Sequence, residues 1–333
     1  MQELHFSIIV PVFNRPEEAK ELLESLCLQT YTDFEVLIVE DGSSVTCKDV
    51  IDPYFSRLNL KYFFKQNEGP GPTRNFGASK AEGNYFIFFD SDCLIPANYM
   101  AIVQQYLHAN DLDCYGGPDR SHPSFTPVQK AISYTMTAFL TTGGIRGGSK
   151  KMDKFHPRSF NMGISKVAFE RTGGYAAMRF GEDLDMSMRI AEAGLHTGLI
   201  IDAFVYHKRR TDFYKFFKQI HNSGIARINL FKRHPSSLKL VHFIPAGFVI
   251  FCLFSILILP LGYKAGMLCL LVYSLLLFLD ALIKEKNLLV AILSVEAAFV
   301  QHFAYGTGFI KAFWRRIILK QEEFHAYKKN FYK

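Results

Sequence analysis

The 333-residue chain is predicted to be an α/β protein with a mostly parallel sheet, followed by amphipathic and transmembrane helices. Three observations predict this fold class. Near-continuous apolar strands alternate with helical patterns in the first part of the chain, which indicates a parallel sheet covered on both faces. The charge changes sign along the chain. Two long apolar runs near the carboxyl end are each able to cross a hydrocarbon core of about 30 Å.

The predicted elements of the sheet follow in order from the amino terminus. Strands are expected at 7–13, 34–41, 60–64 and 85–90, and helices at 16–29, 72–81 and 100–110. Pro16 suits a first helical turn, as do the acids that follow it. We interpret 119–157, which is rich in Ser, Thr, Gly and Lys, as a mobile substrate loop, with plain disorder as the alternative. A further strand is expected at 198–207.

The two parts of the chain differ in charge. Residues 1–203 carry 19 Lys and Arg against 25 Asp and Glu, whereas residues 204–333 carry 19 against 6. This contrast predicts a soluble catalytic part held at an anionic membrane surface, where each basic residue contributes about 1 kcal/mol. Nucleic acid is the competing partner of a basic segment, but the apolar runs argue against it. We therefore expect membrane lipid as a partner and no nucleic acid.

Cysteine usage and the first residues predict the compartment. The six cysteines show no C-x-x-C and no paired spacing, which fits a reducing environment. No charged and apolar leader precedes the first strand, so no signal peptide is predicted. We expect the protein at the cell inner membrane, with its catalytic domain (1–206) in the cytoplasm.

The remaining boundaries follow the charge and hydropathy pattern. Residues 207–240 are predicted to form basic amphipathic helices at the membrane interface, with a helix packed on its own domain as the alternative. The region 241–310 holds two predicted transmembrane helices, at 242–262 and 265–283. A third run, 287–310, contains Glu, Gln and His, and three spans would place the basic tail 311–333 outside. The third run is therefore either a span or a re-entrant or interfacial segment, and the tail is expected in the cytoplasm.

The most informative stretch, YFIFFDSDC, ends in two aspartates. Residues i and i+2 of a strand point the same way, so Asp90 and Asp92 are expected to aim both carboxylates at one point where the sheet stops. Hard oxygen ligands suit Mg²⁺ or Mn²⁺, and a diphosphate would supply the remaining oxygens. A surface turn is the alternative. The apolar run 85–89 argues against it, because open α/β sheets bind ligands at the carboxyl edge of buried strands.

Polar residues also follow the first two strands. The first strand ends in PVFNRP, where we assign Pro11, Val12 and Asn14 to donor binding. The second ends in VEDGSS, and an acid at its tip can hydrogen-bond a nucleobase edge or a ribose. Asp41 is our candidate for this contact, ahead of Glu40, and an ordinary turn is the alternative.

Arg74 opens a helix beside the same edge and is expected to contact base or phosphate. The glycine-containing loop ahead of it, within 67–83, matches neither G-x-G-x-x-G nor G-x-x-x-x-G-K-[ST]. Classical dinucleotide-binding and P-loop folds are therefore disfavoured.

Two further candidates lie near the end of the acidic half. Glu182 and Asp183 stand ahead of a predicted helix, where carboxylates can be simple caps. Alternatively, an aspartate there could accept the proton of an acceptor hydroxyl as a general base. His207 closes the last strand, and its neutral ring nitrogen suits Mn²⁺, with a structural histidine as the alternative.

The order of PVFNRP, VEDGS, TRNFGASKAEG, FFDSD, NMGISKVAFERTGGY, GED and the later histidine over residues 5–210 resembles the family-2 inverting glycosyltransferases, which have the A-type, Rossmann-like nucleotide-sugar fold. Ser91 between the two aspartates is compatible with this family. The resemblance implies these roles: Asp41 at the base, Asp90 at the ribose or metal, Asp92 on the metal, Asp183 as catalytic base, Glu182 placing the acceptor, and His207 completing the metal site.

The resemblance also implies the reaction. The expected enzyme is a membrane-anchored glycosyltransferase that uses Mn²⁺ or Mg²⁺ and a nucleotide-sugar, a UDP-sugar rather than a GDP-sugar. The Q-x-x-R-W signature of processive synthases is missing, since Gln219 is followed by IHNSG, which favours transfer of a single sugar. Membrane attachment suggests a lipid-linked or cell-surface glycan acceptor and a place in polysaccharide biosynthesis. The alternatives are a sugar-phosphate nucleotidyltransferase, disfavoured because PVFNRP lacks a glycine-rich basic loop, and a non-catalytic membrane scaffold.

Overall fold

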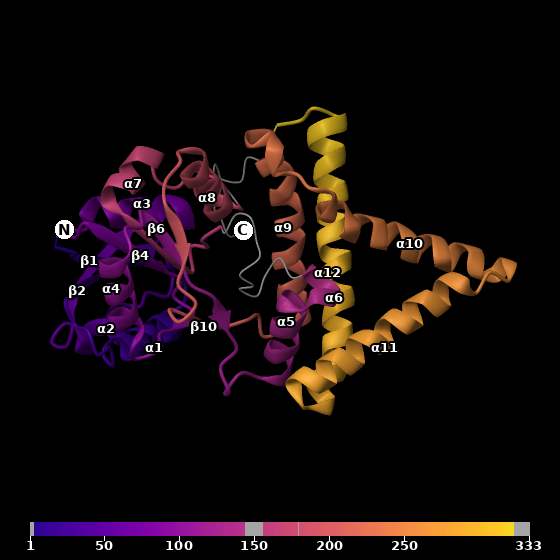
Figure 1. The fold of residues 1–333 in the computed structure, drawn as a ribbon, viewed down its shortest axis with the longest axis horizontal. Coiled ribbons are helices and arrows are strands. Elements are labelled where there is room, and N and C mark those ends of the chain that lie inside the picture. Colours follow the sequence, from indigo (N-terminus) through magenta and orange to yellow (C-terminus); the bar gives the residue numbers. More distant parts are fainter. Residues whose placement is uncertain (1–2, 144–155, 179, 323–333) are drawn as a thin grey trace. The chain divides into compact units, whose positions relative to one another are not determined.

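The computed structural model describes residues 3–143, 156–178 and 180–322. Within these ranges the chain divides into two compact units. The first comprises 3–120 and 156–207, and the second comprises 121–143 and 208–322. Figure 1 shows the strands in the first unit and long helices in the second.

The first unit is built on a seven-stranded sheet. Its strand order is β3-β2-β1-β4-β8-β6-β9, and the first four strands run parallel, whereas β8 is antiparallel to both of its neighbours. The strands are β1 (Phe6–Val12), β2 (Phe34–Asp41), β3 (Asn59–Lys65), β4 (Tyr85–Phe89), β6 (Cys114–Gly116), β8 (Asn161–Ser165) and β9 (Thr197–Leu199). A small second sheet has the order β5-β10-β7, made of β5 (Cys93–Leu94), β10 (Val205–His207) and β7 (Asp119–Arg120).

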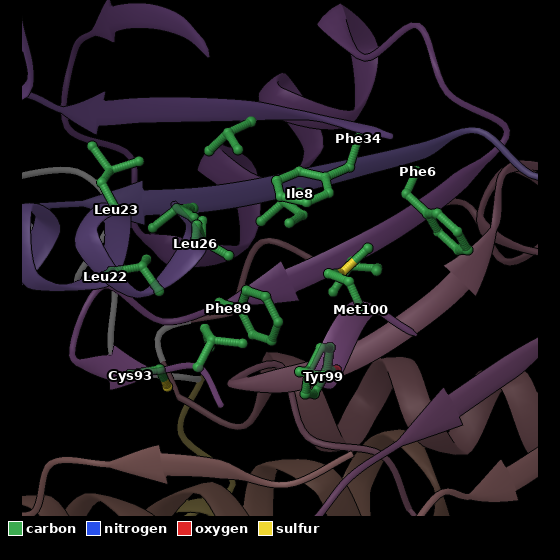
Figure 2. Packing of buried hydrophobic residues seen from close by; sticks show 14 of the residues in the cluster. Phe6, Ile8, Leu22, Leu23, Leu26, Phe34, Phe89, Cys93, Tyr99 and Met100 are labelled. Atoms are coloured by element: carbon green, nitrogen blue, oxygen red, sulfur yellow. The ribbon is translucent and has the colours of Figure 1, made fainter. Parts of the chain in front are cut away.

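Helices cover both faces of the large sheet. They are α1 (Pro16–Leu26), α2 (Lys48–Ile51), α3 (Pro70–Lys80), α4 (Tyr99–Ala109), α7 (Lys166–Thr172) and α8 (Glu182–Glu192), with a 3-10 turn η1 (Asp52–Tyr54). Because side chains alternate along a strand, Ile8 packs with α1 and α4 on one face, and Ile9 packs with α3, α7 and α8 on the other. Figure 2 shows the first of these two cores, which includes Ile8 of β1 together with Leu22, Leu23 and Leu26 of α1.

The second unit is helical. It contains α5 (Pro127–Thr137), α6 (Phe139–Thr142), α9 (Phe213–Arg233), α10 (Ile244–Ile258), α11 (Ala265–Glu285) and α12 (Leu288–Phe313), with short turns η2 (Pro235–Ser237), η3 (Leu240–Phe243), η4 (Leu259–Leu261) and η5 (Trp314–Ile318). The helices α9 and α12 lie side by side, and α10 and α11 form two arms that meet near η4 (Figure 1). Glycines permit the close α9–α12 contact, because a Cβ on Gly308 would lie 2.1 Å from the His221 carbonyl oxygen.

The predicted fold class is confirmed, since a mostly parallel sheet precedes long apolar helices. Two local expectations were wrong. The single strand expected at 198–207 is instead β9 and β10 in different sheets, because a turn closed by the Ala203 amide and the Ile200 carbonyl separates them. Part of the expected loop 119–157 is helical, as α5 and α6, while its centre at 144–155 lies outside the described residues.

The reason for the α5 helix is local capping combined with packing. Thr126 and Gln129 form a capping box at its start, in which each side chain meets the other residue's backbone amide. The apolar side chains of Ile132 and Met136 then pack with Phe216 and other residues of α9 and α12. Residues 121–143 therefore belong to the second unit rather than to the segment that carries the sheet.

Three segments of the second unit are long and apolar enough to cross a membrane by length and composition: 240–261, 265–285 and 288–318. The third is the most buried of them within the protein, and its helix α12 is continuous through the run that the sequence left unassigned. The apolar face of α9 contacts α12, with Phe216 and Ile220 buried, so this face is covered by protein rather than left bare.

Candidate active site

The candidate site lies at the carboxyl ends of the central parallel strands. The strand β4 ends at Phe89, and a turn that contains Asp90, Ser91 and Asp92 follows at once. Because the strand stops before Asp90, the two carboxylates do not follow strand alternation, and each has its own partners. This edge of an open α/β sheet is where such folds bind ligands.

Asp92 joins the ends of three segments. One carboxylate oxygen accepts a hydrogen bond from the guanidinium of Arg15, which follows β1. The other lies 3.1 Å from Nε2 of His207, the last residue of β10. The His207 ring stacks on Phe160 at a centroid distance of 4.8 Å, which fixes its plane. Asp92 and His207, the two expected metal ligands, thus lie next to each other.

Arg74 connects β4 with the start of α8. Its guanidinium lies 2.5 Å from the Asp90 carboxylate and 3.3 Å from that of Glu182. The arginine side chain is only 3% exposed and packs over the ring of Tyr175. Arg74 therefore holds two carboxylates from distant parts of the sequence.

The start of α8 carries the predicted base. Gly181 precedes the helix with a φ of +86°, a conformation that favours glycine. Asp183 accepts a hydrogen bond of 2.5 Å from Nε of Arg158 and another from the Leu184 amide. Both Glu182 and Asp183 are buried, which strengthens every charge interaction around them.

The two neighbouring acids have opposite pKa shifts. Burial raises the pKa of Glu182 to about 7, the charge of Asp183 adds to the rise, and Arg74 opposes it. For Asp183, burial also acts to raise the pKa, but the charge and the hydrogen bond of Arg158 outweigh burial and lower it. Asp183 is thus an ionised carboxylate whose basicity is weakened by Arg158.

Asp41 organises the loop after β3. Its carboxylate accepts hydrogen bonds from the Lys65 ammonium, the Asn67 side-chain amide and the backbone amides of Glu68 and Gly69, at 2.8 to 3.2 Å. The side chain is 2% exposed. A nucleobase would have to replace one of these donors to reach Asp41. Its neighbour Glu40 is fully buried and accepts from Cys47 and Tyr62, a structural arrangement.

The end of β1 contributes mainly through backbone geometry. Asn14 has a φ of +53°, and its Oδ1 accepts hydrogen bonds from the amides of Ser44 and Val45, so it ties the β1 loop to the β2 loop. Val12 is 1% exposed and lies in the apolar core, and Pro11 pairs with the β2 strand. Direct contact with a donor through the Val12 side chain is therefore excluded by its burial in this structure.

The residues present fit a divalent cation. Asp92, Cys93 and His207 bring one ligand atom each within 4.8 Å of one another. A second observation is Nδ1 of His207, which is buried and has no hydrogen-bond partner among the residues that the structure describes. Burial raises the pKa of the Cys93 thiol well above its ordinary value, so this sulfur is not a thiolate at neutral pH. The oxygen of Asp92 and the imidazole of His207 match Mn²⁺ chemistry.

The structure brings most of the predicted residues together. They form three sets: Asp92 pairs with Arg15 and His207, Arg74 pairs with both Asp90 and Glu182, and Asp183 pairs with Arg158. Asp90 therefore lies outside the Asp92 set. The arginines Arg15 and Arg158 were missed. For Arg15 the signal was its place directly after the first strand. No sequence signal marked Arg158, because only the fold carries it to α8.

Comparisons with known proteins agree with this geometry. A family model described as "Glycosyl transferase family 2" matches residues 7–173. An uncharacterized glycosyltransferase of Rickettsia felis is 35% identical over 134 residues, which is 40% of this chain. That match spans only 21% of the relative's own length.

Solved structures show the same fold. The mannosyltransferase PcManGT from Pyrobaculum calidifontis, in complex with GDP-Man and Mn²⁺, has a TM-score of 0.70 at 16% identity and covers 95% of this chain and 89% of its own. S. aureus TarS 1-349 in complex with UDP-GlcNAc has a TM-score of 0.51 at 19% identity, covering 94% and 92%. At such identities the likeness concerns the fold alone.

Proposed function

Because this chain belongs to glycosyltransferase family 2, we propose that it is a membrane-anchored, metal-dependent inverting enzyme that transfers one sugar from a nucleotide-sugar to an acceptor hydroxyl. Glycosyl transfer follows from family membership. The metal, the stereochemistry, the acceptor and the anchoring are our inferences. The observation that supports the metal and the mechanism is the convergence of Asp92 with His207, and of Asp90 with Glu182 at Arg74. The three long apolar segments support the anchoring.

The nucleoside end of the donor is proposed to lie over the loops after β1 and β2. Asn14 and Asp41 hold these loops in place through their bonds to backbone amides. We assign Asp41 to the base, with one of its four donors exchanged, and Pro11 and Ser91 to the surface along which the donor lies. Bound UDP-GlcNAc and GDP-Man occur in the two solved neighbours, and we propose a UDP-sugar here.

The cation is proposed to be Mn²⁺ or Mg²⁺ held by Asp92 and His207, with Asp90 beside them. When bound, it would supply positive charge to the diphosphate. In the present structure the Arg15 guanidinium, 31% exposed at its side chain, supplies positive charge to Asp92. We propose that Arg15 leaves Asp92 and pairs with the diphosphate when the donor enters. Asp92 then keeps a cationic partner, the metal ion, and the diphosphate gains one, Arg15.

Asp183 is proposed to take the proton of the acceptor hydroxyl. A group tied to Arg158 is a poor base, because the pairing lowers its pKa. We propose that Arg158, which is 33% exposed, turns toward the anionic donor and thereby frees Asp183. The hydroxyl oxygen then attacks the anomeric carbon as the bond to the diphosphate breaks, from the opposite face, which inverts the centre.

Glu182 and Arg74 are proposed to position rather than to react. Arg74 is buried between Asp90 and Glu182, so it fixes the distance between the donor side and the acceptor side of the site. A protonated Glu182 could donate a hydrogen bond to the acceptor at neutral pH, because its pKa is raised to about 7.

The acceptor is proposed to be a lipid-linked or cell-surface glycan. Three segments of the second unit are able to cross a membrane by length and composition, which would keep the enzyme beside such acceptors. We propose that 240–261 and 265–285 cross the bilayer and that 288–318 does not, so that the catalytic unit and the basic tail both lie on the cytoplasmic side of the inner membrane. The Lys and Arg excess of the second half is in keeping with the positive-inside tendency.

A donor panel tests the proposal. The purified full-length protein is heated with UDP- and GDP-sugars, with and without Mn²⁺, because a ligand that binds the folded state raises its melting temperature. We expect a Mn²⁺-dependent rise with one donor, together with release of its nucleoside diphosphate. If the protein bound no nucleotide-sugar with or without Mn²⁺, it would instead be a scaffold, and the catalytic assignment would be withdrawn.

A further inference from the structure

A polar cavity of about 330 Å³ lies in the second unit, remote in sequence from the residues of the candidate active site. It forms where α5 begins and where α11 gives way to α12. Its polar lining consists of Ser121, His122, Lys130, Glu285, Lys286 and Asn287. The volume falls in the range of roughly 300–1,000 Å³ that is usual for small-ligand sites.

The walls of this cavity are held by local hydrogen bonds. The Thr126–Gln129 capping box fixes the start of α5, and Asn287 caps α12 by accepting a hydrogen bond of 3.1 Å from the Val290 amide. Lys286 ends α11 in a left-handed conformation with a φ of +51°. The cavity is therefore made by three helix ends of defined geometry rather than by a loose loop.

The charge of the cavity is positive. Lys130 and Lys286 face one carboxylate, Glu285, which gives a net charge of +1 when His122 is neutral. Neither lysine forms an ion pair with any residue in the described ranges. The nearby Asp280 cannot neutralise them, because it already accepts hydrogen bonds from Lys284 at 2.9 Å and from Tyr134 at 2.5 Å.

The cavity also lies at one end of the helical hairpin. The two arms α10 and α11 meet at the turn near η4 (Figure 1), and the cavity is at the opposite end of α11. If the hairpin crosses a bilayer, this end lies at the interface from which both arms start. Three large apolar side chains next to the cavity are more than half exposed: Ile283, Leu288 and Leu289.

We propose that this cavity binds the phosphate of an anionic membrane lipid. Lys130 and Lys286 would donate charge-assisted hydrogen bonds to the phosphate oxygens, with Ser121 and His122 as further partners. The exposed leucines beside it would meet the acyl chains. Basic pockets beside membrane helices bind such headgroups in other proteins. The proposal rests on the membrane association proposed above.

Native mass spectrometry of the full-length protein in detergent, titrated with phosphatidylglycerol, tests the site. We expect one retained lipid in the wild type. Lys130→Gln combined with Lys286→Gln should weaken retention about 30-fold, the equivalent of about 1 kcal/mol for each lysine. Lys130→Arg with Lys286→Arg should retain the lipid, because the charges remain.

A matched pair controls for charge alone. Lys232→Gln with Lys239→Gln removes the same charge from exposed lysines outside the cavity, and we expect less than about a threefold change. An equal loss of lipid retention in both double variants would overturn the site, because it would show that only the total charge attracts the lipid. Inorganic phosphate that displaces the lipid completely at equal concentration would overturn the lipid assignment in favour of free phosphate.

Two further measurements keep this proposal separate from the proposed function. Flotation with pure phosphatidylcholine vesicles reports membrane association, and the donor-dependent melting shift reports the catalytic unit. Retention of phosphatidylcholine as strong as that of phosphatidylglycerol in native mass spectrometry would overturn the lipid site alone. Failure to float with any vesicle would overturn both the anchoring and the site, while the melting shift would still show whether the donor binds.

Discussion

The two units of this protein place apolar side chains in opposite ways. In the first unit the strand residues of the sheet, such as Ile8 and Phe88, are fully buried between two layers of helices. In the second unit the buried positions of α12 are mostly small or polar, including Ala297 and Gln301, whereas Leu257 and Ile283 of the hairpin are 72% and 74% exposed. Small residues inside and large apolar residues outside are typical of helices that pack in lipid.

The charges are arranged as differently as the apolar residues. The first unit gathers carboxylates at one edge of its sheet and pairs several of them with arginines, for example Asp92 with Arg15 and Asp183 with Arg158. The second unit carries its cations near helix ends, as Lys284 and Lys286 do in α11. Buried charged groups with shifted pKa values cluster at functional sites, which favours the first unit as the place of the reaction that we propose.

The largest effect is expected at the proposed base. Asp183→Asn should lower kcat by about 10³-fold, because a positioned general base contributes 10²- to 10⁴-fold, while donor binding changes little. Rates of sugar transfer and donor titrations check this. Glu192→Gln, an exposed acid at the other end of α8, is the control. Full turnover in Asp183→Asn would remove this residue from the mechanism.

The next effect concerns the cation. Asp92→Asn should reduce Mn²⁺-dependent transfer about 10²-fold, since even the loss of an outer partner of a metal ligand costs 10- to 100-fold. The Mn²⁺-dependent melting shift with donor should shrink in parallel. Asp111→Asn, an exposed aspartate elsewhere in the first unit, serves for comparison. An unchanged Mn²⁺ requirement in Asp92→Asn would show that the cation binds elsewhere.

The stability of the helical unit should depend on the close packing of its helices rather than on charge. Gly308→Ala puts a methyl group 2.1 Å from the His221 carbonyl oxygen, so α9 and α12 must separate, at a cost of about 2 kcal/mol in the free energy of unfolding. Unfolding in detergent measures this. Gly247→Ala meets no atom within 4 Å and should be tolerated. Equal stability of the two variants would mean that α9 and α12 do not pack closely.

A smaller effect is expected from the arginine on the base. Arg158→Gln removes the partner that lowers the pKa of Asp183, so burial and the nearby Glu182 would then raise it. The acid limb of the kcat/KM profile, which reports the free enzyme in which Arg158 pairs with Asp183, should move to higher pH. Arg171→Gln, on the surface of α7, should leave the limb in place. An acid limb at the same pH in Arg158→Gln and in the wild type would show that the titration of Asp183 does not control the rate.

The smallest effect concerns Glu182, which faces Asp183, Arg74 and Asp90. Its pKa rises from 4.5 to about 7 on folding, so between these values the folded state holds a proton that the unfolded state has lost. Stability therefore falls as pH rises through this window. Glu182→Gln resembles the protonated form and should add ~1 kcal/mol of stability at pH 8, with no gain near pH 4. A gain that does not vary with pH would contradict the shift.

Sequence reasoning succeeded where a signal is local. The strands predicted at 34–41 and 85–90 agree with the observed ends to within one residue. Their continuous apolar runs are typical of buried parallel strands. It failed where partners are distant. No local signal marks Arg158, and the place of Arg15 directly after the first strand does not reveal that its partner is Asp92, because the fold alone brings these pairs together. The helix α5 was hidden in a polar segment because its packing partners, on α9 and α12, follow about 80 and about 160 residues later.

The central claim is that the carboxylates after β4 and at the start of α8 enclose one donor. The most direct measurement is a crystal structure with Mn²⁺ and a non-hydrolysable nucleotide-sugar, with the ion located by anomalous scattering. We predict Mn²⁺ on Asp92 and His207, and the anomeric carbon between this ion and Asp183. A donor bound with its sugar directed away from Asp183, or an ion on other residues, would contradict the account.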